Sequence, residues 1–548
     1  MKHLEHTRRV SASKHYREKT LFQKTSGKFY TPIWMAQLLA KKILYSIHLK
    51  TNILQIVDPF CGDGRLLIAI AERIARCSSL RMINYRFELW DKDGENLAHA
   101  KAALYNVIRS TKLKARVHTR QWDTFLDSTN QFGQFDLVVT NPPWEALKPD
   151  NRELIELSIL ERRNFIDEMR DYDKALGVHL PYSQPANKLY GWGTNLSRCG
   201  LEIAINLLGP NGRYGIVLPS SILADQVSVT LRKWLLHQTN ILSIDYFPAE
   251  TKPFKQVDQP SIIMIAEKQK RRTALHPIIA KYDYARKEIL SERILLSDED
   301  LHTLGFRIPA ELSTKELALL LKLSKYRPIS DWDVSHGGKL WMGRELDETR
   351  YRSFISNHGK FAFLKGRTVT RFSNVGPLTE FVKKGTREIP TSACYHRIAW
   401  RDVSRRSQTR RMVATIIPPG VVTGNSLHVA YFVDNNQMRL HALLGILNSL
   451  AFEFQLRARL GTGHVSLGSV RDIRVPDLND ISFVRILARL AKRVLSGESA
   501  AEAEIEVVIA DAYNLSQSER NILLNHFTKL APEFSNKLRI ALKIGVHC

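Results

Sequence analysis

Residues 53–64 read ILQIVDPFCGDG, and residues 65–74 continue as RLLIAIAERI. The run 53–57 is typical of a buried strand, and the apolar residues after Gly64 recur with the period of a helix. Gly62 and Gly64 permit positive φ and a close approach between the backbone and a ligand. This stretch therefore predicts a strand, a glycine turn and a helix, the repeating unit of a doubly wound α/β sheet.

The charge of the turn indicates which ligand it can hold. It lacks the Lys-Ser/Thr pair of a phosphate-binding P-loop. Asp58 and Asp63 would repel a pyrophosphate and attract a cation. S-adenosyl-L-methionine carries a sulfonium and an ammonium group and fits this pattern, so we expect it as the cofactor.

Two further carboxylates follow strand-like runs. Asp91 comes after residues 85–90, and Asp123 comes shortly after residues 115–119. A carboxylate at the end of the second strand can accept hydrogen bonds from both ribose hydroxyls of a nucleoside ligand. A solvated loop acid is the alternative for Asp91. Asp123 is expected near the adenine ring, so these strand ends converge on one cleft.

The tetrapeptide Asn141-Pro142-Pro143-Trp144 stands directly after the apolar run 135–140. The side-chain oxygen of Asn141 and the carbonyl of Pro142 are acceptors, and the prolines hold φ near about −65°. Trp144 offers a flat surface for a base. A tight turn after a strand is the alternative, but the combination favours a site that grips a planar amino group.

Taken in order, these motifs resemble those of the N6-adenine DNA methyltransferases of type II restriction-modification systems. The order is that of the gamma class, in which a cofactor-capping motif precedes the glycine loop and a target-recognition domain follows the catalytic domain. The residues that carry the resemblance are Phe29, Tyr30, Thr31 and Pro32, then Asp58 to Gly64 with Pro59, then Asp91, Asp123, and Asn141 to Trp144.

The resemblance extends to residues 209–219, which match a turn and strand of the family. It implies a Rossmann-like S-adenosylmethionine-dependent domain in which residues 29–32 cap the cofactor. It also implies that Phe254 packs on one face of a flipped-out adenine, with Trp144 on the other. The turn reads Phe60-Cys61 where small residues are more usual, and Trp replaces the commoner Tyr or Phe of the tetrapeptide.

The expected chemistry is methyl transfer without a metal. An adenine inside a duplex cannot present N6 to a bound sulfonium, so the nucleotide must be flipped out. Asn141 and the Pro142 carbonyl then accept the N6 hydrogens and direct the nitrogen lone pair at the methyl carbon. Positioning and fixed dipoles supply the rate enhancement.

Composition indicates the partner and the compartment. The 548 residues carry a net charge of +25 at pH 7, which makes a polyanion such as double-stranded DNA the default partner. A cationic membrane-surface protein is the competing explanation, although no apolar stretch is long enough to span a bilayer. Five cysteines without paired spacing indicate free thiols and a cytoplasmic location.

The chain is expected to have five parts. Residues 1–27 form a basic arm, 28–270 the doubly wound catalytic domain, and 271–330 a connecting helical segment. Residues 331–480 are expected to be a mixed α/β target-recognition domain, followed by C-terminal helices over 481–548. A charged insertion at 145–190 is expected to be either a lid over the base pocket or a structural helical pair.

The expected target-recognition domain has cations near 366–367, 397–411 and 457–474. Most of them should contact phosphates, while a few Arg, Asn or Gln side chains read base edges. The run 405–411 alone is more typical of a solvated loop than of a base reader. The short segments that resemble the family's recognition domains are Gly343 to Leu346, Leu364 to Arg367, Arg397 to Arg401, Asn425-Ser426 and Leu444 to Ser449.

Other functions share part of this pattern. The Asn-Pro-Pro-aromatic motif also occurs in enzymes that methylate RNA or protein glutamine, and a fused methyltransferase-nuclease is a further alternative. A DNA-binding subunit without catalysis would not need the set Asp58, Asp91 and Asn141. The sequence predicts a site-specific DNA adenine methyltransferase that protects host DNA. We expect it to act as a monomer on DNA and to have a separate restriction endonuclease as its partner.

Overall fold

The computed structural model divides the chain into two compact units, Met1–Glu311 and Leu312–Cys548. The boundary falls inside the expected connecting segment. The predicted arm 1–27 and Phe29 lie outside the described residues. These are 30–45, 47, 53–150, 154–155, 157–185, 192–254, 259–269, 274–373, 375–383, 389–405, 408–461 and 463–544.

The first unit is built on a nine-stranded sheet in the order β3-β2-β1-β4-β5-β7-β6-β8-β9. β1 runs parallel to both β2 and β4, whereas β7 is antiparallel to β5 and β6. The strands are β1 Ile53–Asp58, β2 Asn84–Asp91, β3 Ala115–Gln121, β4 Phe135–Thr140, β5 Leu208–Pro219, β6 Asn240–Phe247, β7 Ser261–Glu267, β8 Ile278–Tyr282 and β9 Glu288–Arg293.

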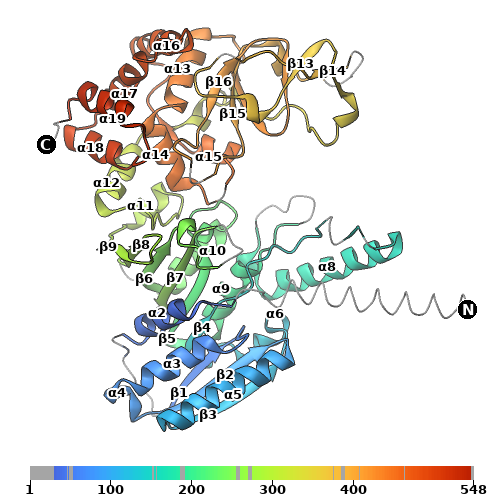
Figure 1. Ribbon diagram of the computed structural model, residues 1–548, viewed down its shortest axis with the longest axis vertical. Coiled ribbons are helices and arrows are strands. Elements are labelled where there is room, and N and C mark those ends of the chain that lie inside the picture. Colours follow the sequence, from blue (N-terminus) through green and yellow to red (C-terminus); the bar gives the residue numbers. More distant parts are fainter. Residues whose placement is uncertain are drawn as a thin grey trace, which may run out of the picture. The chain divides into compact units, whose positions relative to one another are not determined.

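Helices cover both faces of this sheet, which confirms the doubly wound α/β prediction. α2 (Ile33–Ile43), α3 (Arg65–Ala75) and α5 (Gly94–Thr111) share one core cluster with alternate strand residues such as Ile56, Phe87 and Leu137. Figure 1 shows α3 and α5 lying across the strands. α9 (Leu196–Leu207) packs on β4 and β5 and contacts α10 (Val229–Gln238).

The helix of the insertion and several short elements complete the first unit. The expected insertion contains α8 (Ile159–His179), one long helix that contacts α6 (Thr124–Asp127). The others are α4 Ser78–Arg81, α11 Asp298–Thr303, and the 3-10 turns Ser128–Gln131, Pro181–Ser183, Ser220–Leu223 and Ala249–Thr251.

The structure corrects the helical assignment of residues 271–330. β8 pairs with β6 and β9 pairs with β8, so this segment begins by extending the catalytic sheet. In the described part of this segment, the α-helices are α11 and α12 (Thr314–Leu323). The five-residue run of β8 is too short for its alternation to stand out among neighbouring lysines and arginines.

The second unit contains two four-stranded sheets, in the orders β11-β18-β15-β16 and β12-β14-β13-β17, and the pair β10-β19. Its strands are β10 Arg327–Pro328, β11 Leu340–Gly343, β12 Ile355–Ser356, β13 Phe361–Leu364, β14 Phe381–Val382, β15 Arg397–Arg401, β16 Ala414–Ile417, β17 Val421–Thr423, β18 Leu427–Phe432 and β19 Arg474–Val475. Its 3-10 turns are Ile329–Trp332, Val334–His336, Arg352–Phe354, Gly366–Thr368 and Thr391–Cys394.

Helices make up the rest of the second unit, including residues 481 onward as predicted. α16 has the apolar stripe of a core-facing helix, with Phe483, Leu487 and Ala491 buried. The helices are α13 Gln437–Leu447, α14 Leu450–Arg459, α15 Leu467–Arg471, α16 Ile481–Leu495, α17 Ala501–Ala512, α18 Gln517–Asn525 and α19 Pro532–Ala541.

Some of the arginines of the second unit are buried. Arg397 is fully buried and pairs with Glu345 (Nε–Oε1 3.0 Å). Arg410 is buried beside Glu506 (Nη2–Oε1 3.5 Å), and Arg411 donates to the Ser404 carbonyl (3.0 Å). The run 405–411 is therefore not simply a solvated loop, because two of its arginines brace the interior.

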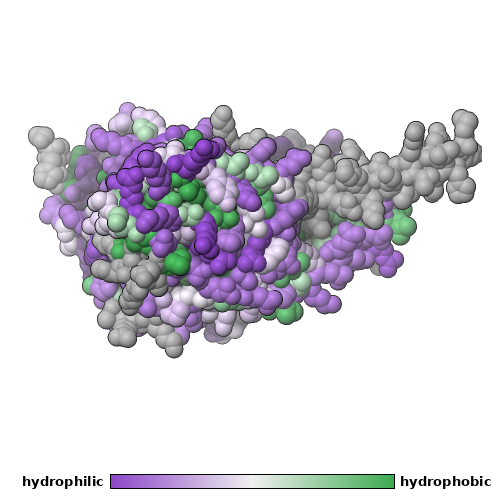
Figure 2. All heavy atoms as spheres, turned by 90° about the horizontal axis from the view of Figure 1, so that it is seen from below, coloured by the Kyte–Doolittle hydropathy of each residue, from purple (hydrophilic) through white to green (hydrophobic). Residues whose placement is uncertain are grey.

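The surface has the expected polar character. The face in Figure 2 is mainly hydrophilic, with hydrophobic residues gathered in one area of it. Across the described ranges, no helix combines the length and the apolar character needed to cross a membrane.

Candidate active site

The predicted site residues meet at the carboxyl edge of the sheet. Asp58 is the last residue of β1, Asp91 is the last residue of β2, and Asn141 directly follows β4. Because these three strands are parallel neighbours, their ends lie side by side. Strand topology, rather than sequence distance, brings these groups together.

The glycine turn has the backbone that its sequence predicts. Gly62 has φ +50° and Gly64 has φ +77°, both in the left-handed region that favours glycine. A Cβ on Gly64 would lie 2.9 Å from the Cβ of Ala100 in α5. A Cβ on Gly62 would lie 3.0 Å from the ring of Tyr30. The glycines therefore allow the turn to fit between α5 and the segment that precedes α2.

The segment before α2 is held against this turn by Arg65. Its guanidinium donates to the Thr31 carbonyl (2.7 Å) and lies over the Tyr30 ring, 5.3 Å from the centroid. It also binds Asp63 (Nε–Oδ1 2.9 Å). Asp63 was expected to attract a cationic ligand, but Arg65 neutralises it. The remaining predicted residue here, Pro32, is the N-cap of α2.

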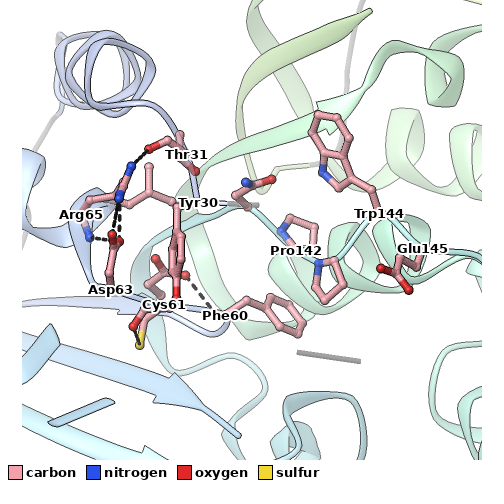
Figure 3. A pocket seen from close by; sticks show the side chains of 14 residues that line it. Tyr30, Thr31, Phe60, Cys61, Asp63, Arg65, Pro142, Trp144 and Glu145 are labelled. Carbon is pink, nitrogen blue, oxygen red and sulfur yellow. Dashed lines mark hydrogen bonds and ion pairs between the residues drawn. The ribbon is translucent and has the colours of Figure 1, made fainter. Parts of the chain in front are cut away.

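Tyr30 and the tetrapeptide stand on opposite sides of one cavity (Figure 3). The space between its walls is about 610 Å³, part of it open to solvent. Its lining residues are Tyr30, Thr31, Asp58, Phe60, Cys61, Gly62, Asp63, Arg65, Leu66, Asn141, Pro142, Pro143, Trp144 and Glu145.

A second, smaller hollow of about 250 Å³ adjoins it through Phe60, which lines both. Asp91 and Asp123 line this hollow and not the larger cavity. Its other lining residues are Pro59, Lys92, Trp122, Thr124 and Phe125. The residues expected around ribose and adenine therefore gather apart from those expected around the methyl group.

Asp58 is buried, and burial raises the pKa of its carboxyl to about 8. Oδ1 accepts the Phe60 amide (3.2 Å), and the Thr140 side chain also stabilises the charged form of the carboxyl. Oδ2 is buried and has no hydrogen bond of good geometry in the described part of the chain. An unpaired buried carboxylate oxygen is costly unless a ligand satisfies it. Asp58 is thus suited to a cationic group placed in the cavity.

Asp91 organises the turn while it faces the second hollow. Its Oδ2 accepts the Gly62 amide and its Oδ1 accepts the Asp93 amide, both at 2.8 Å. Burial raises the pKa of Asp91. Each carboxylate oxygen has a second lone pair, so these bonds leave acceptor capacity for two hydroxyls.

The tetrapeptide is fixed by contacts that its own sequence does not reveal. Pro142 lies against Gly200 of α9, where a Cβ would come within 2.2 Å of the Pro142 Cβ. Asn195 donates its side-chain amide to the Trp144 carbonyl (3.2 Å). Gly200 and Asn195 lie more than 50 residues from the motif, and no local pattern marked them.

Trp144 and Phe254 are in direct contact, with ring centroids 4.9 Å apart and planes at 73°. Phe254 is buried, and the Trp144 indole N–H is buried without an acceptor in the described part of the chain. The structure therefore brings together the two rings expected to hold a base.

Asp123 makes contacts that sequence reasoning missed. Its carboxylate pairs with Lys92 (Nζ–Oδ2 2.6 Å) and accepts hydrogen bonds from the hydroxyl of Tyr172 in α8 (3.0 and 3.1 Å). It also caps α6 by accepting the Phe125 amide (3.1 Å). Lys92 is adjacent to Asp91 in sequence and could have been suspected, whereas Tyr172 comes from the insertion.

Comparison with known proteins agrees with this geometry. Residues 65–254 match the family described as Eco57I restriction-modification methylase. This matched region lies wholly in the first unit and ends at Phe254. The type I restriction enzyme MpnII methylase subunit of Mycoplasma pneumoniae is 21% identical over 274 residues. That alignment covers 48% of this chain and 45% of the relative, so the chain spans less than half of it.

Solved restriction-modification enzymes share the fold beyond the matched residues 65–254. The type IIL enzyme MmeI bound to DNA has a TM-score of 0.56 at 12% identity, covering 91% of this chain and 76% of its own. A nuclease-deletion mutant of LlaGI with a DNA substrate mimic scores 0.53 at 12% identity, covering 86% and 47%. The DrdV–DNA complex scores 0.53 at 9% identity, covering 86% and 57%.

The residues that line the two hollows fit S-adenosylmethionine. Asp58 supplies a buried, unsatisfied acceptor for a cation, and Asp91 supplies an acceptor beside the second hollow. The two adjoining hollows have complementary chemistry, because the larger one reaches Asn141 and the smaller one reaches Asp123. This is the division that a ligand with a methionine half and an adenosine half requires.

Proposed function

We propose that this protein is a site-specific DNA adenine-N6 methyltransferase that uses S-adenosyl-L-methionine. One observation carries the proposal. Asp58 and the Asn141 to Trp144 tetrapeptide line a single cavity, while Asp91 lines the hollow next to it. When bound there, the cofactor supplies a methyl group on a positively charged sulfur.

Each residue has a distinct role in the proposed reaction. Asp58 accepts hydrogen bonds from the ammonium group, Asp91 accepts them from ribose, and Asp123 lies at the adenine end. Residues 30–32, with Tyr30 and Thr31 lining the cavity, cover the cofactor. Pro59, Gly62 and Gly64 shape the turn on which it rests.

The tetrapeptide acts on the target base. The Asn141 side-chain oxygen and the Pro142 carbonyl accept hydrogen bonds from the two N6–H groups. The nitrogen lone pair therefore leaves conjugation and faces the methyl carbon. Positive charge that develops on N6 is stabilised by these fixed dipoles. Trp144 and Phe254 provide the aromatic surfaces that replace the stacking lost by a flipped adenine.

We further propose that the second unit recognises the DNA. Restriction-modification enzymes with this fold have been solved with DNA, and the net charge of +25 favours a polyanionic partner. These observations support DNA over the alternatives of RNA or protein glutamine. The proposed role is protection of host DNA from a restriction endonuclease of the same specificity, carried by a separate protein.

The test is sequencing that detects N6-methyladenine in DNA from cells that express the chain. Methylation at one defined sequence by the wild type, and its loss in Asn141→Ala, would support the proposal. Asn106→Ala, at an exposed position of α5, is the control for folding and expression. If the purified protein transfers labelled methyl groups to RNA or to protein but not to duplex DNA, the proposal is wrong.

A further inference from the structure

The second unit contains one group of cationic side chains built around a buried acid. Asp402 directly follows β15, and its side chain is only 8% exposed. Its carboxylate accepts hydrogen bonds from His428 (Nε2–Oδ1 3.1 Å) and His464 (Nδ1–Oδ2 3.0 Å). It also forms an ion pair with Arg344 (Nη2–Oδ2 3.1 Å). Burial raises its pKa, but the two histidines and Arg344 outweigh this and lower the pKa of Asp402 to about 2.

The backbone fixes this acid from two directions. The Asp402 amide donates to the Ser426 carbonyl (3.0 Å), and the Asp402 carbonyl accepts the Val465 amide (2.6 Å). Arg344 follows β11, and β18 lies between β11 and β15 in the sheet. Three strands of one sheet therefore set the position of the Asp402 carboxylate and of the guanidinium that it holds.

Arg344 differs from the buried arginines of the second unit. Arg397 and Arg410 have side chains that are 0% and 7% exposed, and they pair with acids inside the unit. The side chain of Arg344 is 48% exposed, although its partner Asp402 is buried. One amino group of the Arg344 guanidinium is thus paired with the protein, while about half of the side chain is exposed.

This arrangement suits the recognition of a base edge. A guanidinium has five N–H donors in a rigid plane, and the ion pair with Asp402 uses only part of them. Two parallel donors match the O6 and N7 acceptors of guanine in the major groove, which is the commonest specific contact of arginine. A side chain held by a buried partner loses less freedom on binding than an unrestrained one.

We propose that Arg344, oriented by Asp402, reads a guanine in the DNA that this protein modifies. The inference rests on the proposed function and names a reader that the charge pattern could not identify. Arg344 would contact the base, whereas Asp402, His428 and His464 act as positioning residues. The carboxylate of Asp402 lowers the net charge that the pair presents to a phosphate, but it leaves the remaining N–H donors of Arg344 available to a base edge.

The experiment selects bound duplexes from a random DNA library with the full-length protein, and compares wild type with Arg344→Lys. Lysine keeps the charge but cannot form two parallel hydrogen bonds. One guanine of the selected sequence should lose about 5- to 150-fold of its preference, the discrimination of one bidentate contact. Asp402→Asn should relax the same position to a smaller degree.

Arg350→Lys is the matched control, since Arg350 is exposed in the same unit and lies over the Tyr351 ring (5.5 Å). It should leave the selected sequence unchanged. If Arg344→Lys selects the same sequence as the wild type, the assignment is wrong. It is also wrong if Arg344→Ala loses affinity equally for every sequence and Arg344→Lys has wild-type affinity. Because selection needs no catalysis, a wild type that selects a sequence but never methylates it would defeat only the proposed function.

Discussion

The ring of Trp144 meets the ring of Phe254 edge to face, at a centroid distance of 4.9 Å. A base stacked between two parallel rings needs about 7 Å, because each stacked contact takes about 3.5 Å. The rings must therefore separate or turn before an adenine can lie between them. This rearrangement gives up a contact of the order of 0.5–1.5 kcal/mol.

Removing the Trp144 ring should weaken the capture of an extruded base. We expect Trp144→Ala to lose about 1–3 kcal/mol of stabilisation, the usual range for one base–aromatic stack. With 2-aminopurine at the target position, fluorescence will report how far the base is displaced in wild type and variant. Phe254→Leu, which keeps bulk without an aromatic face, gives the matching measurement for the other ring. Identical signals in wild type and Trp144→Ala would show that Trp144 only packs.

Asn141→Ala should separate binding from catalysis. Loss of one hydrogen bond that strengthens in the transition state lowers turnover by about 10²–10³. The dissociation constants for cofactor and DNA should stay nearly unchanged, because Asp58 and Asp91 remain in place. Single-turnover methylation with calorimetry on the same preparations measures both effects. Full methylation by this variant would rule out the proposed role of Asn141.

Ribose recognition by Asp91 can be measured with a matched ligand. A hydrogen bond to a charged acceptor contributes about 1.5–3 kcal/mol, so the wild type should bind S-adenosylhomocysteine more tightly than its 2′-deoxy analogue. In Asp91→Ala this preference should disappear. Because Asp91 also holds the Gly62 amide, overall affinity will fall as well. A preference that persists in the variant would remove Asp91 from the ribose site.

Cofactor binding should depend on pH through Asp58. Burial raises its pKa to about 8, so below that pH the carboxyl is mostly protonated, and a bound cation must drive the proton off. Affinity should then rise by about tenfold per unit from pH 6 towards pH 8, and level off above it. Calorimetry in two buffers of different ionisation enthalpy counts the released protons. If Asp58→Asn releases as many, another group is responsible.

The contact between Tyr172 and Asp123 should anchor α8 to the turn that begins α6. The Tyr172 hydroxyl donates to a carboxylate that also binds Lys92, so Tyr172→Phe removes one charge-assisted hydrogen bond, and amide hydrogen exchange along α8 should become faster. Exchange in α9 should not change. Tyr182→Phe is the control, because the Tyr182 ring stacks on Trp234 (4.8 Å). Unaltered exchange in α8 would mean that other contacts hold this helix.

The catalytic sheet could be predicted because its signals are local. The glycine turn, Asp91 and the Asn141 tetrapeptide each follow an apolar strand, and parallel strands place such ends together. Contacts between distant segments left no comparable signal. Gly200 matters because Pro142 lies on it, and Tyr172 because its hydroxyl reaches Asp123, and neither stands out in sequence.

Charge was the least reliable guide in the second unit. Sequence shows the number of arginines but not their partners, so Arg397 and Arg410 could not be distinguished from exposed cations. Both are held by Glu345 and Glu506, which lie 52 and 96 residues away in sequence. The pairing that leaves Arg344 half exposed depends on Asp402, whose surroundings only the fold defines.

The border strands of the nine-stranded sheet affect how the protein behaves toward other chains. An uncovered sheet edge displays unpaired backbone groups and can add a strand from another molecule. β3 carries Arg116, His118 and Arg120, and β9 carries Glu288, Glu292 and Arg293. A strand added at either border would have to bring apolar residues beside charges that prefer water. Extension of the sheet by β8 and β9 thus ends it on a strand that is a poor template for aggregation.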